Sequence, residues 1–210
     1  MSKSVEFFDQ QFRHHSTDAA LQLNPFEEQA LPYLSGDVLD FGSGMGNLAF
    51  AAAKRGCRVN ALDGSPVAVN HMQSRAEAES STVSATLADL RDYRIVGNYD
   101  CVVSIGLLMF FDCPTAFKVL AELQDHVRPG GYAIVNVLIE GTSYLDMFDS
   151  EAHCLFAPSE LPGRFSEWEI KVSEFNNFEA PRQTMKRFCT VIARKPCAWN
   201  VFAASNSNAS

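Results

Sequence analysis

The sequence lacks the features that mark several large classes of protein. No stretch approaches the roughly 20 consecutive apolar residues of a membrane span, and the N-terminus has no apolar signal core. The 17 Lys and Arg residues are outnumbered by 25 Asp and Glu residues, which makes the formal net charge −8. A broad nucleic-acid surface needs clustered Lys and Arg to neutralise phosphates. We therefore expect a cytoplasmic protein that binds neither membrane nor nucleic acid.

The six cysteines form no pattern typical of a metal site. None belongs to a C-x-x-C pair, and no group of Cys and His has the spacing of zinc ligands, so we predict no metal. Cys101 and Cys189 lie in apolar runs and are expected to be small core residues. We expect reduced structural thiols throughout, with Cys113 and Cys154 as the candidates for greater accessibility.

The length of 210 residues is typical of one domain with a substantial core. We predict a single domain over residues 1–195. Residues 1–35 form a phenylalanine-rich arm that either folds over a ligand cleft as a lid or packs on the edge of the core. Residues 196–210, which end in Ser, Asn and Ala, are expected to be a flexible tail.

Three glycines directly follow a short apolar strand. The run from Val38 to Gly46 reads Val-Leu-Asp-Phe-Gly-Ser-Gly-Met-Gly, and an alanine-rich helical segment comes next. A strand, a glycine turn and a helix in this order build a nucleotide site at the carboxyl edge of a parallel sheet. Glycine tolerates positive φ and lets a ligand approach the backbone, while the helix N-terminus attracts a carboxylate or phosphate.

The spacing of these glycines separates two classes of nucleotide-binding enzyme. A dinucleotide fingerprint has glycine at its first, third and sixth positions, but the sixth position counted from Gly42 is Asn47. This counts against an NAD-dependent oxidoreductase. The G-x-G-x-G pattern preceded by Asp40 resembles motif I of the class I S-adenosylmethionine (SAM) methyltransferases. That resemblance implies SAM as the cofactor and S-adenosylhomocysteine (SAH) as its product.

The rest of the chain predicts alternating strands and helices, closed by a hairpin whose polar turn spans 176–183. In the methyltransferase sheet that this resemblance implies, the last strand lies antiparallel beside the fifth strand. We therefore predict an α/β fold with a seven-stranded, mostly parallel, doubly wound (Rossmann-like) sheet and an antiparallel C-terminal hairpin. The expected strands are 38–41, 59–62, 83–87, 99–105, 132–139, 167–175 and 186–195, and the expected helices are 47–55, 66–78 and 114–127.

Polar residues at the ends of the expected strands predict the cofactor site. Asp63 ends the second strand, where its carboxylate is placed to accept both ribose hydroxyls. Asp89 ends the third strand and either accepts from the exocyclic amine of adenine or is a solvated loop residue. The expected cofactor-binding residues are Asp40, Gly42, Ser43, Gly44, Met45, Gly46, Asp63, Gly64, Ser65, Ala88, Asp89, Leu90, Ser104 and Ile105.

The segment after the fourth strand narrows the choice of methyl acceptor. It has neither the Asp/Asn-Pro-Pro-Tyr/Phe motif of DNA and protein amide methyltransferases nor the Pro-Cys nucleophile of cytosine C5 methylation. The tract 108–112, Leu-Met-Phe-Phe-Asp, is instead similar to a stretch found there in the TehB-type tellurite methyltransferases. Pro-Gly-Gly-Tyr at 129–132, Trp-Glu-Ile at 168–170 and the closing segment 187–195 are similar as well.

This resemblance implies methyl transfer to a small acceptor, with a tellurite- or selenite-type oxyanion as the leading candidate. A small organic thiol, amine or carboxylate is the alternative, and a non-catalytic SAM-binding module is a further one. A soft oxyanion attacks through its own lone pair and needs a cation to hold it. Arginine is best suited to this, because its guanidinium group can donate two parallel hydrogen bonds to an oxyanion. We therefore predict that Arg182 and Arg187 position the substrate.

One departure from the family's pattern bears on the acceptor. The family's Glu-x-His-Arg run corresponds to residues 179–182, Glu-Ala-Pro-Arg, in which Pro181 stands in place of the histidine.

Aromatic side chains are expected to wall the sulfonium of SAM by cation–π contact, and the candidates are Phe7, Phe8, Phe110 and Phe111. The sequence does not indicate an oligomeric state.

Overall fold

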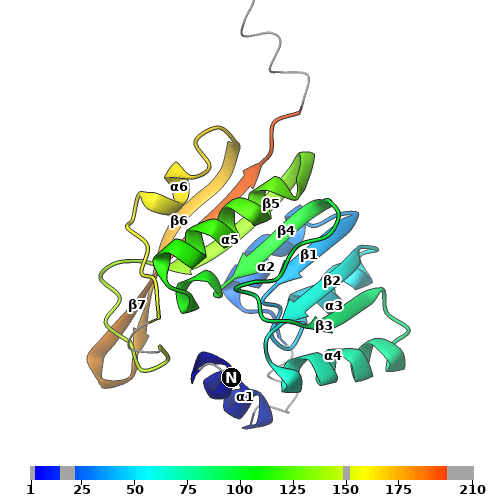
Figure 1. Ribbon diagram of the computed structural model, residues 1–210, viewed down its shortest axis with the longest axis horizontal. Coiled ribbons are helices and arrows are strands. Elements are labelled where there is room, and N and C mark those ends of the chain that lie inside the picture. The colour runs from blue at the N-terminus through cyan, green and yellow to red at the C-terminus, as the bar shows by residue number, and fades with distance from the viewer. Residues whose placement is uncertain (1–2, 15–21, 149–151, 198–210) are drawn as a thin grey trace, which may run out of the picture.

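The structure, a computed structural model, describes residues 3–14, 22–148 and 152–197. Its strands are β1 (Asp37–Phe41), β2 (Arg58–Asp63), β3 (Val83–Leu87), β4 (Tyr99–Ile105), β5 (Val127–Leu138), β6 (Glu169–Ala180) and β7 (Thr184–Arg194). They form one sheet in the order β3-β2-β1-β4-β5-β7-β6 (Figure 1). β1 to β5 are parallel, whereas β7 is antiparallel to both β5 and β6. The predicted fold class is confirmed.

Helices pack on both faces of this sheet. They are α1 (Lys3–His14), α2 (Pro25–Ala30), α3 (Asn47–Lys54), α4 (Pro66–Ala78), α5 (Cys113–Asp125) and α6 (Glu160–Gly163), with 3-10 turns η2 (Leu31–Tyr33), η3 (Leu108–Phe110) and η4 (Pro181–Gln183). Successive side chains of β1 point to opposite faces. Val38 packs with residues of α2, α3 and α4, and Leu39 packs with residues of α5 and α6. The sheet is therefore doubly wound, as predicted.

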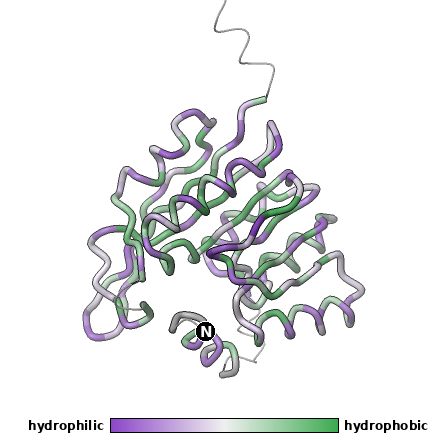
Figure 2. The backbone as a smooth tube through the Cα atoms, viewed as in Figure 1, coloured by the Kyte–Doolittle hydropathy of each residue, from purple (hydrophilic) through white to green (hydrophobic). Residues whose placement is uncertain are grey.

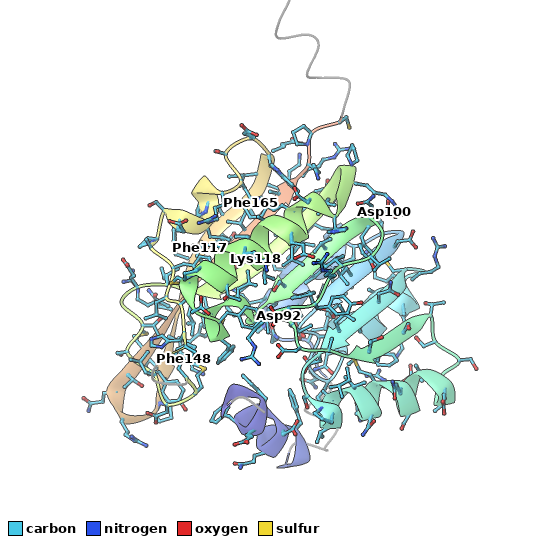
Figure 3. The ribbon with its side chains drawn as sticks, in the orientation of Figure 1. Asp92, Asp100, Phe117, Lys118, Phe148 and Phe165 are labelled. Carbon is cyan, nitrogen blue, oxygen red and sulfur yellow. A yellow bond between two sulfur atoms is a disulfide. The ribbon has the colours of Figure 1, made fainter. Side chains whose placement is uncertain are left out.

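Buried apolar side chains concentrate in the central strands, while the connections and outer helix surfaces are hydrophilic (Figure 2). On the α5 face, Phe117 and Phe165 belong to the larger core cluster or pack against it (Figure 3). Phe148 belongs to a smaller cluster beside the β6–β7 hairpin. This smaller cluster lies next to the functional site described below.

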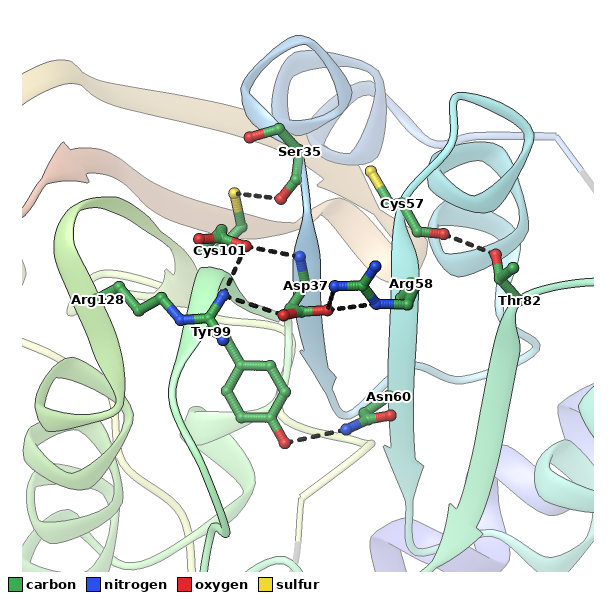
Figure 4. Close-up of polar contacts among 10 residues, drawn as sticks. Ser35, Asp37, Cys57, Arg58, Asn60, Thr82, Tyr99, Cys101 and Arg128 are labelled. Atoms are coloured by element: carbon green, nitrogen blue, oxygen red, sulfur yellow. Dashed lines mark hydrogen bonds and ion pairs between the residues drawn. The ribbon is translucent and has the colours of Figure 1, made fainter.

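The amino ends of the central strands carry a network of charged groups. The Asp37 carboxylate accepts from Arg58 Nε at 2.7 Å and from Arg128 Nη1 at 3.0 Å (Figure 4). Arg128 Nη1 also donates to Asp100 at 2.7 Å. These hydrogen bonds, that of Arg128 first, lower the pKa of Asp37. The network lies at the amino ends of the parallel strands. Ligands in folds of this kind bind at the opposite edge of the sheet, beyond the carboxyl ends of these strands.

Two predicted boundaries are wrong. β6 continues to Ala180, so the turn of the hairpin is only η4 rather than 176–183. The cross-strand partners offered by β7 satisfy the backbone of 176–180, even though these residues have a turn-like composition. β5 starts at Val127, before the Pro-Gly-Gly run, because a register shift opposite 99–101 accommodates that run. The longer β6 matters because it carries Phe178 and Glu179 to the site.

The prediction that the cysteines are reduced is wrong for two of them. Cys113, at the start of α5, forms a disulfide with Cys154, which is fully buried. Cys154 N also donates to Met109 O at 3.0 Å, so this segment is held by the disulfide to α5 and by a hydrogen bond to η3. Disulfides are rare in the cytosol, and the cytoplasmic location stays a prediction. Among the described residues, no helix combines the length and the hydrophobicity that crossing a membrane requires.

We expect the disulfide to stabilise the fold. It closes a loop with a sequence separation of 41 residues, and such a cross-link lowers the entropy of the unfolded chain. Replacing both cysteines with serine should lower the free energy of unfolding by about 3 kcal/mol. Urea unfolding without reductant measures the difference, and Cys197→Ser, at an exposed free thiol, is the matched control. An unchanged midpoint in the double variant would contradict the expectation.

Candidate active site

The glycine turn after β1 forms a backbone cradle at the carboxyl edge of the sheet. Gly42, Gly44 and Gly46 have φ of 88°, 52° and 78°, a region that favours glycine. The N–H groups of Gly42 and Ser43 donate to Leu62 O at 2.8 and 3.0 Å, which holds the turn against β2. A Cβ on Gly46 would lie 2.7 Å from Met72 Sδ, so this glycine also allows α3 and α4 to pack closely.

Asp63, the last residue of β2, links the glycine turn to the start of α4. One carboxylate oxygen accepts from Gly44 N at 2.8 Å, and the other accepts from Ser65 N at 2.8 Å. Burial raises the pKa of Asp63, an effect opposed by these backbone hydrogen bonds. Ser65 caps α4, because its Oγ accepts from Ala68 N at 3.1 Å. The carboxylate therefore sits in a preorganised position at the tip of β2.

Asp40 is a buried carboxyl group beneath the glycine turn. Only 5% of its surface is exposed, and its Oδ2 has no hydrogen-bond partner in the described part of the chain. Burial raises its pKa to about 8, with smaller contributions from the negative charges of Glu27 and Asp63. An unpaired buried oxygen of this kind is costly, so it favours a ligand that supplies a donor or a positive charge.

Helix α1 lies across the carboxyl end of the sheet, between the β6–β7 hairpin and α4 (Figure 1). Its Asp9 is buried and hydrogen-bonded to Ser65 Oγ. The ring of Phe8 packs edge-on against Phe110 of η3, with centroids 5.3 Å apart. The predicted arm thus contributes side chains to the site, while residues 1–2 and 15–21 of that arm lie outside the described residues.

These elements enclose a cavity of about 1030 Å³, at the upper end of the range for small-molecule sites. Twelve of the fourteen predicted cofactor-binding residues line it: Asp40, Gly42, Ser43, Gly44, Met45, Asp63, Gly64, Ser65, Ala88, Asp89, Leu90 and Ile105. The two exceptions are Gly46, which is buried at the start of α3, and Ser104, whose side chain is fully buried within β4. The aromatic candidates Phe7, Phe8, Phe110 and Phe111 line the cavity as well.

The cavity extends from the glycine turn to the β6–β7 hairpin, where its wall is aromatic. Phe26 of α2 packs against Phe188 of β7 and Phe178 of β6, with ring centroids 4.9 and 5.6 Å apart. The rings of Phe178 and Phe188 are themselves 5.8 Å apart. We call these three residues the aromatic triad. Tyr144, Leu138 and Met147 also line this end of the cavity.

Comparisons with known proteins agree with this geometry. A family model described as a methyltransferase domain matches residues 38–131. Hemagglutinin 1 of Eikenella corrodens is 27% identical over 169 residues, which cover 76% of this chain and 54% of that protein. The probable S-adenosyl-L-methionine-dependent methyltransferase TehB of Haemophilus influenzae (strain 10810) is 26% identical over 165 residues, which cover 75% of this chain and 57% of TehB. The chain therefore spans a little more than half the length of these curated relatives.

A solved structure extends the comparison to the whole fold. The crystal structure of TehB from Haemophilus influenzae matches with a TM-score of 0.74 at 22% identity, over 91% of this chain and 67% of that chain. The match to the methyltransferase family model includes the glycine turn and Asp63, which belong to the predicted cofactor site. Residues 38–131 therefore form a methyltransferase domain, and the chain as a whole resembles the probable SAM-dependent methyltransferase TehB.

The residues of this methyltransferase fit its cofactor, SAM. The cradle is open at Gly44, where the nearest atom to an added Cβ would be Phe12 Cζ at 3.6 Å. Asp40 offers an unpaired carboxyl oxygen, which suits the positive charges of SAM. Asp89 is less available, because its carboxylate accepts from Arg91 Nη2 at 2.7 Å and Nε at 2.9 Å. These hydrogen bonds lower the pKa of Asp89.

The two arginines predicted to position the substrate do not line the cavity. Arg182 lies in the hairpin turn with φ of 60°, its side chain is 81% exposed, and it pairs with Asp146 at 3.3 Å. Arg187 lies on β7 between Lys186 and Phe188, which both line the cavity. Side chains alternate along a strand, so Arg187 points to the other face, where its Nη1 donates to Glu140 O at 3.3 Å.

Several cavity residues were not predicted from the sequence. Lys186 and Phe188 lie on the same face of β7 as Thr190, so the alternation of 186–195 contained the signal for them. Glu27 belongs to a capping box in which its carboxylate accepts from Asn24 N at 2.8 Å, and burial raises its pKa. No local pattern marked Tyr144 or Asn136. The side chain of Asn136 is fully buried at the cavity wall, with Nδ2 donating to Thr190 Oγ1 at 2.9 Å.

Proposed function

We propose that this methyltransferase transfers the methyl group of SAM to a small organic acceptor with an aromatic or other apolar body. The observation that carries the proposal is the aromatic triad, whose three rings contact one another and line the same cavity as the glycine turn. An inorganic oxyanion has no apolar surface to bury against three phenylalanine rings. An aromatic acceptor gains both the hydrophobic effect and ring–ring contacts there.

The protein's own task in this reaction is to position the cofactor and the acceptor and to exclude water. When bound, SAM supplies a methyl group that is already activated by its sulfonium. We propose that the glycine turn and Asp63 hold the cofactor, while the triad, Tyr144 and Met147 orient the acceptor and keep water out. Glu27 lines the cavity as a carboxylate that can accept a hydrogen bond from an N–H, O–H or S–H group of the acceptor.

A tellurite- or selenite-type oxyanion is the second candidate, supported by the resemblance to TehB. The placement of Arg182 and Arg187 outside the cavity lining weighs against it, since these arginines are the groups expected to hold the anion. The third possibility, a non-catalytic SAM-binding module, is disfavoured because the cavity continues past the cofactor cradle to the hairpin and is not filled by side chains.

An acceptor panel tests this proposal. Formation of SAH should be measured with the full chain, SAM and each of 4-mercaptobenzoate, 4-aminobenzoate, phenethylamine, selenite and tellurite. We expect at least one organic compound to be methylated faster than either oxyanion. Turnover of selenite or tellurite alone would overturn the organic acceptor and favour the second candidate.

A variant of the aromatic triad links this activity to the cavity. Phe188→Ala removes the ring that contacts both other members, so KM for the best organic acceptor of the panel should rise about tenfold while SAM affinity is retained. Phe175→Ala is the matched control, because Phe175 is on the same hairpin, is 53% exposed and does not line the cavity. Equal KM values for the two variants would show that the aromatic triad does not bind the acceptor.

A further inference from the structure

The acceptor end of the cavity contains a lysine whose position is set by the hairpin. Lys186 of β7 is the cross-strand partner of Phe178, and it shares a face of β7 with Phe188. Its Nζ lies 4.7 Å from the centre of the Tyr144 ring. The backbone of Ser143 donates to Met185 O at 2.9 Å, which holds the segment bearing Tyr144 against β7. The ammonium group is therefore fixed beside the aromatic triad.

Within residues 3–14, 22–148 and 152–197, no carboxylate forms an ion pair with the Nζ of Lys186. The side chain is half-buried, and burial lowers its pKa. The Tyr144 ring compensates only in part, since a cation–π contact is weaker than a charged hydrogen bond. A half-buried cation that contacts an aromatic ring and has no ion-pair partner among the described residues is best satisfied by an anionic ligand.

We propose that Lys186 is the binding residue for an anionic group, such as a carboxylate, on the methyl acceptor. The proposal rests on the proposed function and narrows it to an organic anion whose apolar body lies against the aromatic triad. An inorganic oxyanion could supply the same negative charge, and the test separates the two sources. Arg187, its neighbour on the strand, cannot take this role because it points to the opposite face.

Binding to the SAH complex tests this proposal without requiring turnover. Benzoate, neutral benzyl alcohol of similar shape, and selenite should each be titrated calorimetrically into the full chain saturated with SAH. We expect benzoate to bind at least tenfold more tightly than benzyl alcohol. Lys186→Met should weaken benzoate binding roughly 10- to 100-fold and leave benzyl alcohol and SAH unaffected, because only the charged hydrogen bond is lost.

Two variants make the result specific to the charge at this position. Lys186→Arg keeps the cation and should retain benzoate binding within a few-fold. Arg182→Met removes an exposed cation from the same hairpin and should bind as the wild type does. Unchanged benzoate binding in Lys186→Met would overturn the proposal, as would failure of both benzoate and selenite to bind the wild type.

The outcomes also distinguish this proposal from the proposed function. If selenite binds and depends on Lys186 while benzoate does not bind, Lys186 is an anion site but the organic acceptor is wrong. If benzoate binds and depends on Lys186 while no organic compound of the panel is methylated, the anion site stands and the proposed function fails.

Discussion

Replacing Asp63 with alanine is expected to weaken the binding of SAM and SAH by roughly 100-fold or more. The carboxylate holds the glycine turn and the start of α4 in place, since it accepts from Gly44 N and from Ser65 N at 2.8 Å each. Its remaining lone pairs are the predicted acceptors for the ribose hydroxyls. The variant loses these charged hydrogen bonds and leaves two part-buried N–H groups without their partner, and each such loss costs about 1–3 kcal/mol.

Calorimetric titration with SAM and SAH measures this loss. Asp63→Asn should be intermediate, because the amide keeps one acceptor oxygen but has no charge. Asp92→Ala is the control, since Asp92 is exposed on the loop after β3 and does not line the cavity (Figure 3). Affinities within threefold of the wild type in Asp63→Ala would remove this residue from the cofactor site.

Asp40 should make the stability of the ligand-free protein depend on pH. Its pKa is raised from the ordinary 3.8 to about 8, chiefly by burial. Between these two values the folded state binds one more proton at this site than the unfolded state. The contribution of Asp40 to the free energy of unfolding therefore falls as pH rises, by about 1.4 kcal/mol per pH unit and at most roughly 6 kcal/mol in total.

The variant Asp40→Asn isolates this contribution from all other titrating groups. Asparagine resembles the protonated acid in shape but does not titrate, so it should become more stable relative to the wild type by about 4 kcal/mol between pH 5 and pH 8. Urea unfolding of both proteins at several pH values measures the difference. A difference that stays constant over this range would show that Asp40 titrates normally.

The same group connects stability to cofactor binding. SAM carries positive charges, and a cation near Asp40 favours the ionised carboxylate. Saturating SAM should therefore flatten the pH dependence of the wild type, and Asp40→Asn should bind SAM more weakly. The burial of a carboxyl group beneath the glycine turn thus destabilises the free protein in a way that the cofactor relieves.

The order of strands and helices and the glycine turn after β1 were accessible from the sequence. They depend on short-range features, namely apolar periodicity, helix caps and the tolerance of glycine for positive φ. Gly42, Gly44 and Gly46 all adopt that conformation, and Ser65 caps α4 as its position before Pro66 predicts. The end of each parallel strand meets the same edge of the sheet, so Asp40 and Asp63 could be placed together from their positions alone.

The acceptor end of the cavity was decided by tertiary structure. Phe26, Tyr144 and Lys186 come from three segments far apart in the chain, and only packing brings them to one wall. A shift of one residue in register reverses which side chains a strand presents, and this is why Lys186 rather than Arg187 lines the cavity. The pairing of Cys113 with Cys154 has the same origin, because it depends on where a long connection passes over η3.

The amino-acid sequence by itself therefore determined the fold class and the positive-φ glycine turn, which follow from local backbone preferences and burial patterns, and its motifs carried the methyltransferase resemblance. Only the tertiary structure decided which residues face the acceptor, because that depends on the register of β7, the length of β6 and the packing of α1 and α2 across the end of the sheet.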